Sequence, residues 1–411
     1  MQAEIITIGD ELLIGQVVDT NSAWMAQRLN EAGVKVVRKS TVGDHPEHML
    51  DAISKGMERS DLVLLTGGLG PTKDDRTRDV LCRFFDCGLV TNQAVLDGLE
   101  RYFGARGRAV SDTNRDQARV PEKCTAIFNH HGTAPGMWFE DGGHILVSMP
   151  GVPYEMKAMM DGFVIPQLRE RFALPHVVHY TITTIGIPES HLSDLLSTWE
   201  QKLPNRYALA YLPSPGLVRL RLSCYDAHAV EQAEMLQLLE EMKQLVQSYL
   251  FSTGEQLPEQ IIGEMLRIRQ HTISLAESCT GGFISHLITS VPGSSIWYMG
   301  SSISYANEVK TTFLGVDSSV IESKGAVSEE VAKAMAEGIR AKLSTTWSLA
   351  TTGIAGPGGG SPEKPVGTVW IALSGPNGTV TKLCRFGDNR LRNIQMTAMT
   401  AFKMLRDAME A

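Results

Sequence analysis

The chain has 411 residues, more than one ordinary hydrophobic core can hold, so its length indicates two or three domains. Hydrophobic residues make up 43% of it and charged residues 20%, which is typical of a soluble globular protein. The formal net charge is -8 and the sequence has no basic run of the kind that binds phosphate backbones, so a nucleic-acid partner is disfavoured.

Residues 1–172 alternate between strand and helix patterns, starting with the strand-like "AEIITIG". The stretch "TNSAWMAQRLNEAG" is predicted to be helical, with Met25, Leu29 and Ala32 on one face and Gly33 at its end. After a further strand and helix comes "DLVLLTGGLG", a fully apolar strand that runs into glycines. Apolar strands separated by helices indicate a parallel sheet covered on both faces, so we expect an α/β sandwich domain here.

Residues 173–253 predict a small α+β domain that connects or dimerises, since "HYTITTIGI" and "GLVRLRLSCYD" are strand-like and helical patterns separate them. Residues 254–411 predict a second α/β sandwich, which opens with a helix whose apolar stripe is Ile261, Met265 and Ile268. Its strand candidates are "TISLAE", "SIWYMGSSISY", "WSLATTGIAGPGGG", "GTVWIALSG" and "VTKLCRFG", and its other helices are expected at 281–291, 328–344 and 391–409.

The cysteine pattern and the chain start bear on the compartment. Six scattered cysteines without a CxxC pair argue against a disulfide framework or a zinc ribbon. No apolar run reaches the ~18 residues of a membrane span, and Met1 is followed by neither a basic start nor a signal-peptide cleavage site. We therefore expect a cytoplasmic protein without a membrane partner.

The first domain has two polar corners, meaning turns at the end of a predicted strand, that combine glycines with carboxylates. Glycines let the backbone approach phosphate oxygens, and carboxylates suit ions of the Mg²⁺ type. The candidate phosphate-binding glycines are Gly67, Gly68 and Gly70, and the candidate metal ligands are Asp10, Glu11, Asp74 and Asp75. The alternative is that each acid is a helix cap or a solvated residue, because carboxylates in a first helical turn also meet the helix dipole favourably.

Two further corners lie in the last domain, in "SLAESCTGG" and "ATTGIAGPGGG". Ligands collect at the carboxyl ends of parallel strands, where helix N-termini present unpaired amide donors. The candidate ligand-binding residues are Ser278, Thr280, Gly281, Thr352, Gly353, Gly356 and Gly358. Singly, each corner could be a structural turn. Together they are consistent with an anionic ligand held between them.

A serine nucleophile needs an activating base. Lys310, on the helix or turn after the strand that ends at Tyr305, could accept the proton of Ser278 if burial lowered its pKa towards neutrality. The alternative reading of Lys310 is a solvated helix residue. Cys279 is the rival nucleophile, although without a visible histidine partner it reads better as a buried small residue. His271 stands in no position that suggests a Ser-His-Asp triad.

The motifs "AESCTGG", "SYANEVKTTFLGV", "GAVSEEVA", "TTGIAGPGGG" and "PVGTVWIAL" closely resemble the nicotinamide mononucleotide deamidase domain of the CinA (competence/damage-inducible) family. The resemblance implies an amidohydrolase that converts nicotinamide mononucleotide to nicotinate mononucleotide and ammonia without a cofactor. It places the active-site groups at Ser278, Tyr305, Lys310 and Thr352. The family commonly has a GDR stretch where this chain reads "FGDNRLRNIQ", which leaves Arg390 or Arg392 as the site arginine, with Arg392 preferred.

Residues 1 to about 170 resemble the molybdopterin-binding (MoaB/MogA-like) domain in its CinA version, through "GDELLIGQVVDTNS", "TGGLGPTKDD", "NRDQA", "GTAPG" and "MPGVPYEM". Within the family this domain implies an ADP-ribose pyrophosphatase that depends on a divalent metal, Mg²⁺, Mn²⁺ or Co²⁺. The middle segment resembles the family's small KH-like module, but it has no Gly-x-x-Gly loop, so RNA clamping is disfavoured. The resemblance also implies a homodimer.

Three functional hypotheses stay open at this point. The first is a bifunctional enzyme acting on nicotinamide mononucleotide and ADP-ribose. In the second, only the last domain is catalytic and the first binds a pterin or nucleotide as a sensor. The third is a competence or recombination adaptor, to which the family name points.

Overall fold

The computed structural model describes residues 1–72 and 74–411, so Lys73 of the glycine-rich "TGGLGPTKDD" motif lies outside the described residues. The chain forms two compact units. The first consists of Met1–Val178 with Tyr225–Val230, and the second of His179–Cys224 with Glu231–Ala411.

The first unit is built on a six-stranded sheet of order β2-β1-β3-β8-β7-β6. Its strands are β1 (Gln2–Ile8), β2 (Lys35–Val42), β3 (Leu62–Thr66), β6 (Thr125–Ile127), β7 (Gly136–Asp141) and β8 (His144–Met149). The pairs among β2, β1, β3 and β8 are parallel, as predicted. The β8–β7 and β7–β6 pairs are antiparallel. Between β7 and β8, Gly142 and Gly143 adopt positive φ and close a tight hairpin.

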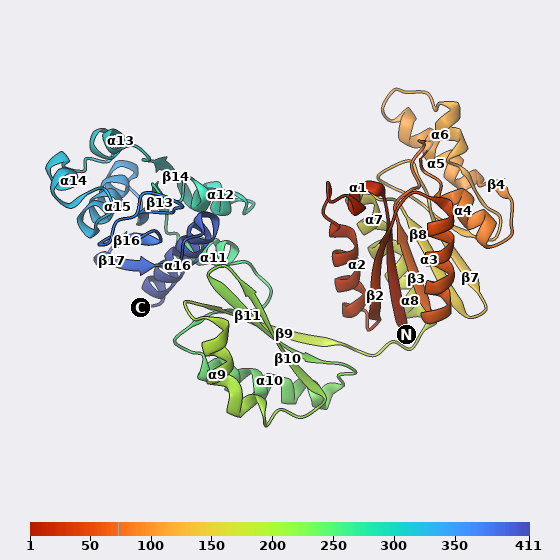
Figure 1. Cartoon of the computed structure of the whole chain (residues 1–411), viewed down its shortest axis with the longest axis horizontal. Coiled ribbons are helices and arrows are strands. Elements are labelled where there is room, and N and C mark those ends of the chain that lie inside the picture. The colour runs from red at the N-terminus through yellow and green to blue at the C-terminus, as the bar shows by residue number, and fades with distance from the viewer. Residues whose placement is uncertain (73) are drawn as a thin grey trace. The chain divides into compact units, whose positions relative to one another are not determined.

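Helices cover both faces of this sheet (Figure 1). They are α1 (Asp10–Leu13), α2 (Thr20–Glu31), α3 (Pro46–Arg59), α4 (Thr77–Phe84), α5 (Gln93–Gly104), α6 (Asp112–Asp116), α7 (Pro153–Met159) and α8 (Ile165–Arg171), with a π-helical turn, Met160–Val164, between the last two. Strands β4 (Leu89–Thr91) and β5 (Arg119–Pro121) form a separate ribbon. Ile5 packs with Met25 and Leu29 of α2, whereas the next residue, Ile6, packs with Met49 and other residues of α3 on the opposite face.

The second unit begins with a four-stranded sheet of order β10-β11-β9-β12. Its elements are β9 (Val178–Ile185), α9 (Glu189–Glu200), β10 (Tyr207–Ser214), β11 (Leu217–Cys224), α10 (Ala229–Leu245) and β12 (Leu250–Thr253). Ile185 and Phe251 of this sheet join the hydrophobic core of the following domain. Gly216 is required at that junction, since its φ is 89° and a Cβ there would lie 2.9 Å from Cβ of Met399.

The remainder of the second unit is a five-stranded sheet of order β14-β13-β15-β16-β17, in which β14, β13 and β15 are parallel and β16 and β17 antiparallel. Its strands are β13 (Ile273–Glu277), β14 (Tyr298–Ile303), β15 (Trp347–Gly353), β16 (Thr368–Gly375) and β17 (Gly378–Arg385). Its helices are α11 (Pro258–Arg269), α12 (Phe283–Thr289), α13 (Asn307–Thr312), α14 (Ser318–Lys324), α15 (Glu329–Leu343) and α16 (Arg390–Glu410), with a 3₁₀ turn at Ser294–Ile296.

One core of this domain lies between the sheet and α11, α12 and α16, and the other lies under α15. Leu275 and Leu349 face the first core, whereas Ala276 and Ala350 face the second. The expected strands and helices are therefore present, and the sheet is covered on both faces.

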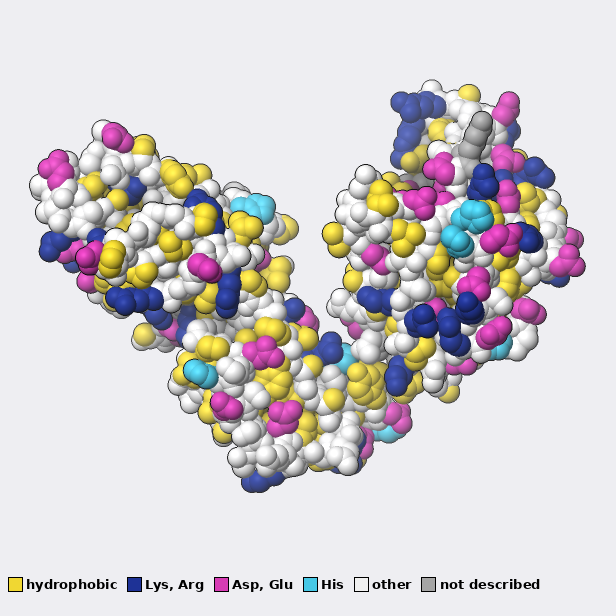
Figure 2. All heavy atoms as spheres, viewed as in Figure 1, with side chains coloured by type: hydrophobic (Ala, Val, Ile, Leu, Met, Phe, Trp, Pro, Cys, Tyr) yellow, Lys and Arg dark blue, Asp and Glu magenta, His cyan; other side chains and the backbone are white. Residues whose placement is uncertain are grey.

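Two surface features bear on partners. None of the described helices is both long enough and apolar enough to cross a membrane. Figure 2 shows acidic and basic side chains interspersed over the drawn face of both units.

Candidate functional site

The first corner of the C-terminal domain joins the end of β13 to α12. Ser278 is 9% exposed, and its amide donates to the carbonyl of Thr351 at 2.9 Å, which ties the corner to β15. Gly281 and Gly282 have φ of 59° and 95°, a conformation that glycine adopts without strain. A Cβ on Gly281 would meet nothing within 4 Å, so the space beside it is open to a ligand.

Glu277, which the sequence analysis did not single out, closes the N-terminus of α12. Its side chain is 1% exposed and accepts hydrogen bonds from the amides of Gly282 (3.1 Å), Ile284 (3.2 Å) and Ser285 (2.8 Å), and from the Ser285 hydroxyl (2.6 Å). The expectation of unpaired amide donors at this helix is therefore wrong. A carboxylate from the chain itself already occupies the place where an anionic ligand would bind.

Lys310 is the one buried residue of α13, and its side chain points inward. It is 1% exposed, and Nζ lies 2.8 Å from the carbonyl oxygen of Ser304 and 3.3 Å from that of Tyr305. The amide of Ser304 in turn donates to the carbonyl of Glu277 at 2.8 Å, so a chain of two hydrogen bonds connects Lys310 to the last residue of β13, which Ser278 follows. Burial lowers the pKa of Lys310. The alternative reading of a solvated helix residue is wrong.

The neighbouring thiol has the opposite character. Cys279 is buried, and burial raises its pKa to about 12. A thiolate is therefore disfavoured at this position. Thr280 is also buried, and its hydroxyl lies 2.7 Å from that of Thr351. This contact gives Thr280 a role in holding the corner to β15 rather than in facing open space.

The second corner follows β15. Thr351 of β15 pairs with Glu277 of β13, so the next residues, Thr352 and Ser278, stand side by side. Thr352 is buried, and its hydroxyl donates to the carbonyl of Ala326 at 2.7 Å. Gly353 has a steric role instead, because a Cβ there would lie 2.8 Å from the carbonyl oxygen of Thr368 in β16.

Arg390 connects this second corner to Tyr305. It donates through Nη1 to the carbonyl of Gly356 at 2.8 Å and through Nη2 to the Tyr305 hydroxyl at 3.0 Å, while Tyr305 itself is 61% exposed. Arg392, the arginine preferred from the sequence, donates its backbone amide to the cap residue Asn389. The structure thus makes Arg390 the better candidate.

In the first unit, a cavity of about 400 Å³ lies over the carboxyl ends of the parallel strands. It brings together six of the seven residues predicted there, namely Gly67, Gly68, Gly70, Glu11, Asp74 and Asp75. The acidic residues Asp44 and Glu155 line it too, and the sequence analysis missed both. Asp44 comes two residues after the end of β2, just as Asp10 comes two residues after the end of β1, so that signal was present in the sequence.

The predicted metal ligand Asp10 is turned towards Asp44. The amide of Asp10 donates to Asp44 Oδ2 at 3.1 Å, and the amide of Asp44 donates to Asp10 Oδ1 at 3.3 Å. Burial raises the pKa of Asp44, and the charges of Asp10, Glu11 and Asp74 raise it further. Asp75 accepts hydrogen bonds from the amide and hydroxyl of Thr72.

Within residues 1–72 and 74–411, no group of three or more His, Cys, Asp or Glu side chains is arranged to hold a metal ion. The donor set still fits a magnesium-type ion that is completed by water and substrate phosphate, since such ions use only one or two protein carboxylates. Burial raises the pKa of Asp44 most and the neighbouring carboxylates raise it further, and a bound cation would relieve the repulsion among these carboxylates. Metal binding therefore stays a prediction that the lining of the cavity supports.

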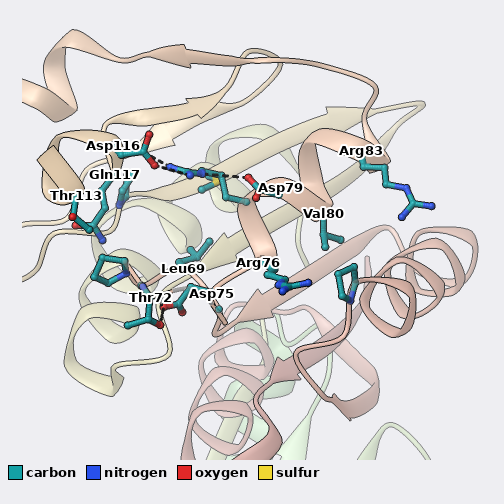
Figure 3. Close-up of a pocket in the computed structure, with 17 residues that line it drawn as sticks. Leu69, Thr72, Asp75, Arg76, Asp79, Val80, Arg83, Thr113, Asp116 and Gln117 are labelled. Atoms are coloured by element: carbon teal, nitrogen blue, oxygen red, sulfur yellow. Dashed lines mark hydrogen bonds and ion pairs between the residues drawn. The ribbon is translucent and has the colours of Figure 1, made fainter.

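A larger cavity, of about 620 Å³, shares Gly68, Gly70 and Asp75 with the acidic one. Figure 3 shows side chains that line it, that of Asp116 among them. Arg78 also lines this cavity, and its Nη2 donates to Asp116 Oδ2 at 2.8 Å. Asp116 belongs to the "NRDQA" motif, which supports the family resemblance but predicts no role for this residue.

Comparison with known families accounts for almost the entire chain. Residues 4–170 match the family described as "Probable molybdopterin binding domain", residues 179–252 the "Damage-inducible protein CinA KH domain", and residues 255–409 the "CinA C-terminal domain". The fold thus defines a three-part α/β protein, in which a MoaB-like domain is followed by a KH-like domain and a CinA C-terminal domain.

Relatives extend over the same length. A CinA-like protein of Cytophaga hutchinsonii is 44% identical over 98% of this chain and 97% of its own, and one of Flavobacterium psychrophilum is 42% identical over 98% of both. The crystal structure of the competence/damage inducible protein CihA from Agrobacterium tumefaciens is 35% identical and covers 39% of this chain and 100% of its own, with a TM-score of 0.36. The chain belongs to the CinA family.

Proposed function

We propose that the C-terminal domain is an amidohydrolase that converts nicotinamide mononucleotide to nicotinate mononucleotide and ammonia. The observation that carries the proposal is the buried Lys310, whose Nζ is held by the carbonyl of Ser304 just after β14, the strand that pairs with β13. A lysine with a lowered pKa can act as a general base near neutral pH. The family resemblance supplies the substrate.

In this proposal the Ser278 hydroxyl attacks the carboxamide carbon, and its proton passes to the neutral amine of Lys310. The carbon–nitrogen bond then breaks, and ammonia leaves with the proton that Lys310 returns. Water hydrolyses the resulting ester, which releases nicotinate mononucleotide and restores the hydroxyl. Arg390, beside the exposed Tyr305, provides a positive charge for the substrate phosphate.

The test is ammonia release from nicotinamide mononucleotide by the purified full chain. Ser278→Ala should abolish the release while leaving the circular dichroism spectrum and the melting temperature unchanged. Cys279→Ala should retain release, because burial disfavours the thiolate. A Ser278→Ala protein that stays active beside an inactive Cys279→Ala protein would show that the nucleophile is the thiol.

We propose further that the N-terminal domain hydrolyses ADP-ribose to AMP and ribose 5-phosphate with a divalent metal, Mg²⁺, Mn²⁺ or Co²⁺. The acidic cavity supports this proposal, since one or two of the carboxylates that line it could hold the ion beside the glycine loop, together with water and the substrate phosphates. When bound, the ion would neutralise phosphate charge and activate water. Gly67 and Gly68, with φ of 115° and 64°, let the backbone approach the phosphates.

This second proposal is tested by incubating the full chain with ADP-ribose and each of the three metals. Formation of AMP supports it. If no metal yields AMP, the N-terminal domain is a binding module for a pterin or nucleotide. Filter binding at low salt tests the adaptor hypothesis separately, and sedimentation tests the implied homodimer.

A further inference from the structure

Gln117 has a buried side-chain amide without partners. It follows α6 directly and is 6% exposed, and neither Oε1 nor Nε2 has a hydrogen-bond partner among the residues that the structure describes. Buried amides in folded proteins are nearly always paired, because losing hydration without a replacement hydrogen bond is costly. Gln117 therefore offers one acceptor and two donors that the fold itself does not use.

The position of this amide links the two cavities of the first unit. Gln117 lines both the acidic cavity of about 400 Å³ and the larger cavity of about 620 Å³. Residues 68–71 of the glycine loop line both cavities as well. In Figure 3 Gln117 lies next to Thr113 and Asp116 at the wall of the larger cavity.

The larger cavity is lined by both apolar and polar side chains. Leu69, Val80 and Met137 provide apolar surface, and the volume is within the usual range for a small-ligand site. Two of its arginines are already paired, Arg78 with Asp116 and Arg83 with Glu47. The acidic cavity, in contrast, carries the glycines and carboxylates suited to phosphates and a cation.

We propose that the Gln117 amide binds the edge of a fused heteroaromatic base, at a point where a hydrogen-bond donor of the base stands beside an acceptor. The base then lies in the larger cavity and its phosphates lie at the glycine loop. Adenine and pterins share this edge, and a glutamine side chain pairs with it through two parallel hydrogen bonds. Under the proposed pyrophosphatase activity, on which the choice of nucleotide rests, the base is the adenine of ADP-ribose. Gln117 is then a specificity residue of that site.

The test measures binding without hydrolysis, by calorimetry on the full chain in the absence of metal. The probes are AMP, its analogue with unsubstituted purine, which lacks the exocyclic amine, and 6-hydroxymethylpterin. The variant is Gln117→Met, which keeps the length of the side chain and removes its hydrogen bonds. The control is Gln93→Met on the exposed start of α5.

The wild-type chain should bind AMP at least about tenfold more tightly than the purine analogue, and Gln117→Met should bind both about equally weakly. Gln93→Met should behave as the wild type does. If the affinity for the pterin depends on Gln117 and the affinity for AMP does not, Gln117 binds the edge of a base as proposed and the ligand is a pterin. Affinities for AMP and the pterin that are unchanged in Gln117→Met overturn the proposal.

Melting temperature separates a ligand-binding amide from a structural one. Because the amide has no hydrogen-bond partner within residues 1–72 and 74–411, Gln117→Met should leave the melting temperature unchanged or raise it. A clear drop would mean that the amide supports the fold, and would overturn the proposal. The proposed pyrophosphatase activity can fail independently. If binding depends on Gln117 but no AMP forms from ADP-ribose, only the proposed pyrophosphatase activity is contradicted. If Gln117→Met hydrolyses ADP-ribose with an unchanged KM, only the proposed role of Gln117 is contradicted.

Discussion

At the residue scale, the burial of Lys310 affects both the stability of the chain and the proposed role of this lysine as a general base. Burial lowers the pKa of Lys310 in the folded chain, so the unfolded chain binds the proton of this lysine more readily. The free energy of unfolding therefore rises with pH between the lowered pKa and the ordinary lysine value of ~10.4. Lys310→Met removes the buried amine. We expect ammonia release to fall by about 10² to 10⁴ while the melting temperature at pH 7 does not fall.

The pH profile of the wild-type chain tests the same residue. Ammonia release should rise as pH rises through the lowered pKa of Lys310, since only the neutral amine accepts the serine proton. Lys333→Met, at an exposed position of α15, is the matched control and should keep both the profile and the rate. A profile without that rising limb, or an active Lys310→Met protein, would contradict the role of the lysine.

Glu277 gives a second prediction at this scale. Its carboxylate accepts four hydrogen bonds from the start of α12, and such bonds are stronger when the acceptor is charged. Glu277→Gln should lower the free energy of unfolding by about 2 kcal/mol in urea denaturation. Glu322→Gln, on the exposed surface of α14, should change it by less than about 0.5 kcal/mol. Equal effects of the two substitutions would show that the cap contributes nothing.

At the element scale, periodicity predicted which strands and helices form, but less reliably which face is buried. The predicted stripe of α11 was Ile261, Met265 and Ile268, yet Ile268 is 65% exposed and the fully buried side chains are Ile262 and Leu266. The stretch "QIIGEML" has apolar residues on adjacent positions, so two stripes one residue apart fit the pattern equally well. Only the packing of α11 against α16 and β12 decides between them.

The ends of the predicted strands indicated where the candidate sites lie, but not which contacts each polar side chain makes in them. Ser278 and Lys310 could be proposed from their neighbourhood in the sequence and from the family motifs. The choice of Arg390 over Arg392 depends on which side of the first turn of α16 faces Tyr305. Glu277 and Gln117 lie in the motifs "AESCTGG" and "NRDQA", but a motif does not say that the first side chain caps α12 or that the second is left unpaired among the described residues.

The loop after β15 offers a matched pair of glycines. Gly356 has φ of 95°, and a Cβ there would lie 2.5 Å from Cγ1 of Val366 and 3.0 Å from the carbonyl oxygen of Asp388. A Cβ on Gly358 would meet nothing within 4 Å. Gly356→Ala should therefore lower the free energy of unfolding by about 2 kcal/mol, and Gly358→Ala by less than about 0.5 kcal/mol.

The same pair also tests whether the loop faces substrate. Because the space beside Gly358 is open, Gly358→Ala should raise the KM for nicotinamide mononucleotide without lowering the melting temperature. Gly356→Ala should lower both the melting temperature and the rate of ammonia release. A Gly356→Ala protein as stable as Gly358→Ala would contradict the steric argument.

At the scale of the whole molecule, the two candidate sites lie in separate compact units, and each site is built from residues of its own unit. Asp44 and the glycine loop belong to the first unit, and Ser278 and Lys310 to the second. Nothing in either site requires a side chain from the other, so we expect the two proposed activities to be independent in the full chain.

Reciprocal substitutions in the full chain test this independence. Asp44→Asn removes a carboxylate that the neighbouring acids already crowd, and it should abolish AMP formation from ADP-ribose while ammonia release stays within about twofold of the wild-type rate. Ser278→Ala should do the reverse. Each variant is the control for the other, because both keep the complete chain. If Ser278→Ala also lowered AMP formation without a change in melting temperature, the two sites would be energetically coupled. The same coupling should then change the affinity of the first unit for AMP when nicotinate mononucleotide is bound to the second unit.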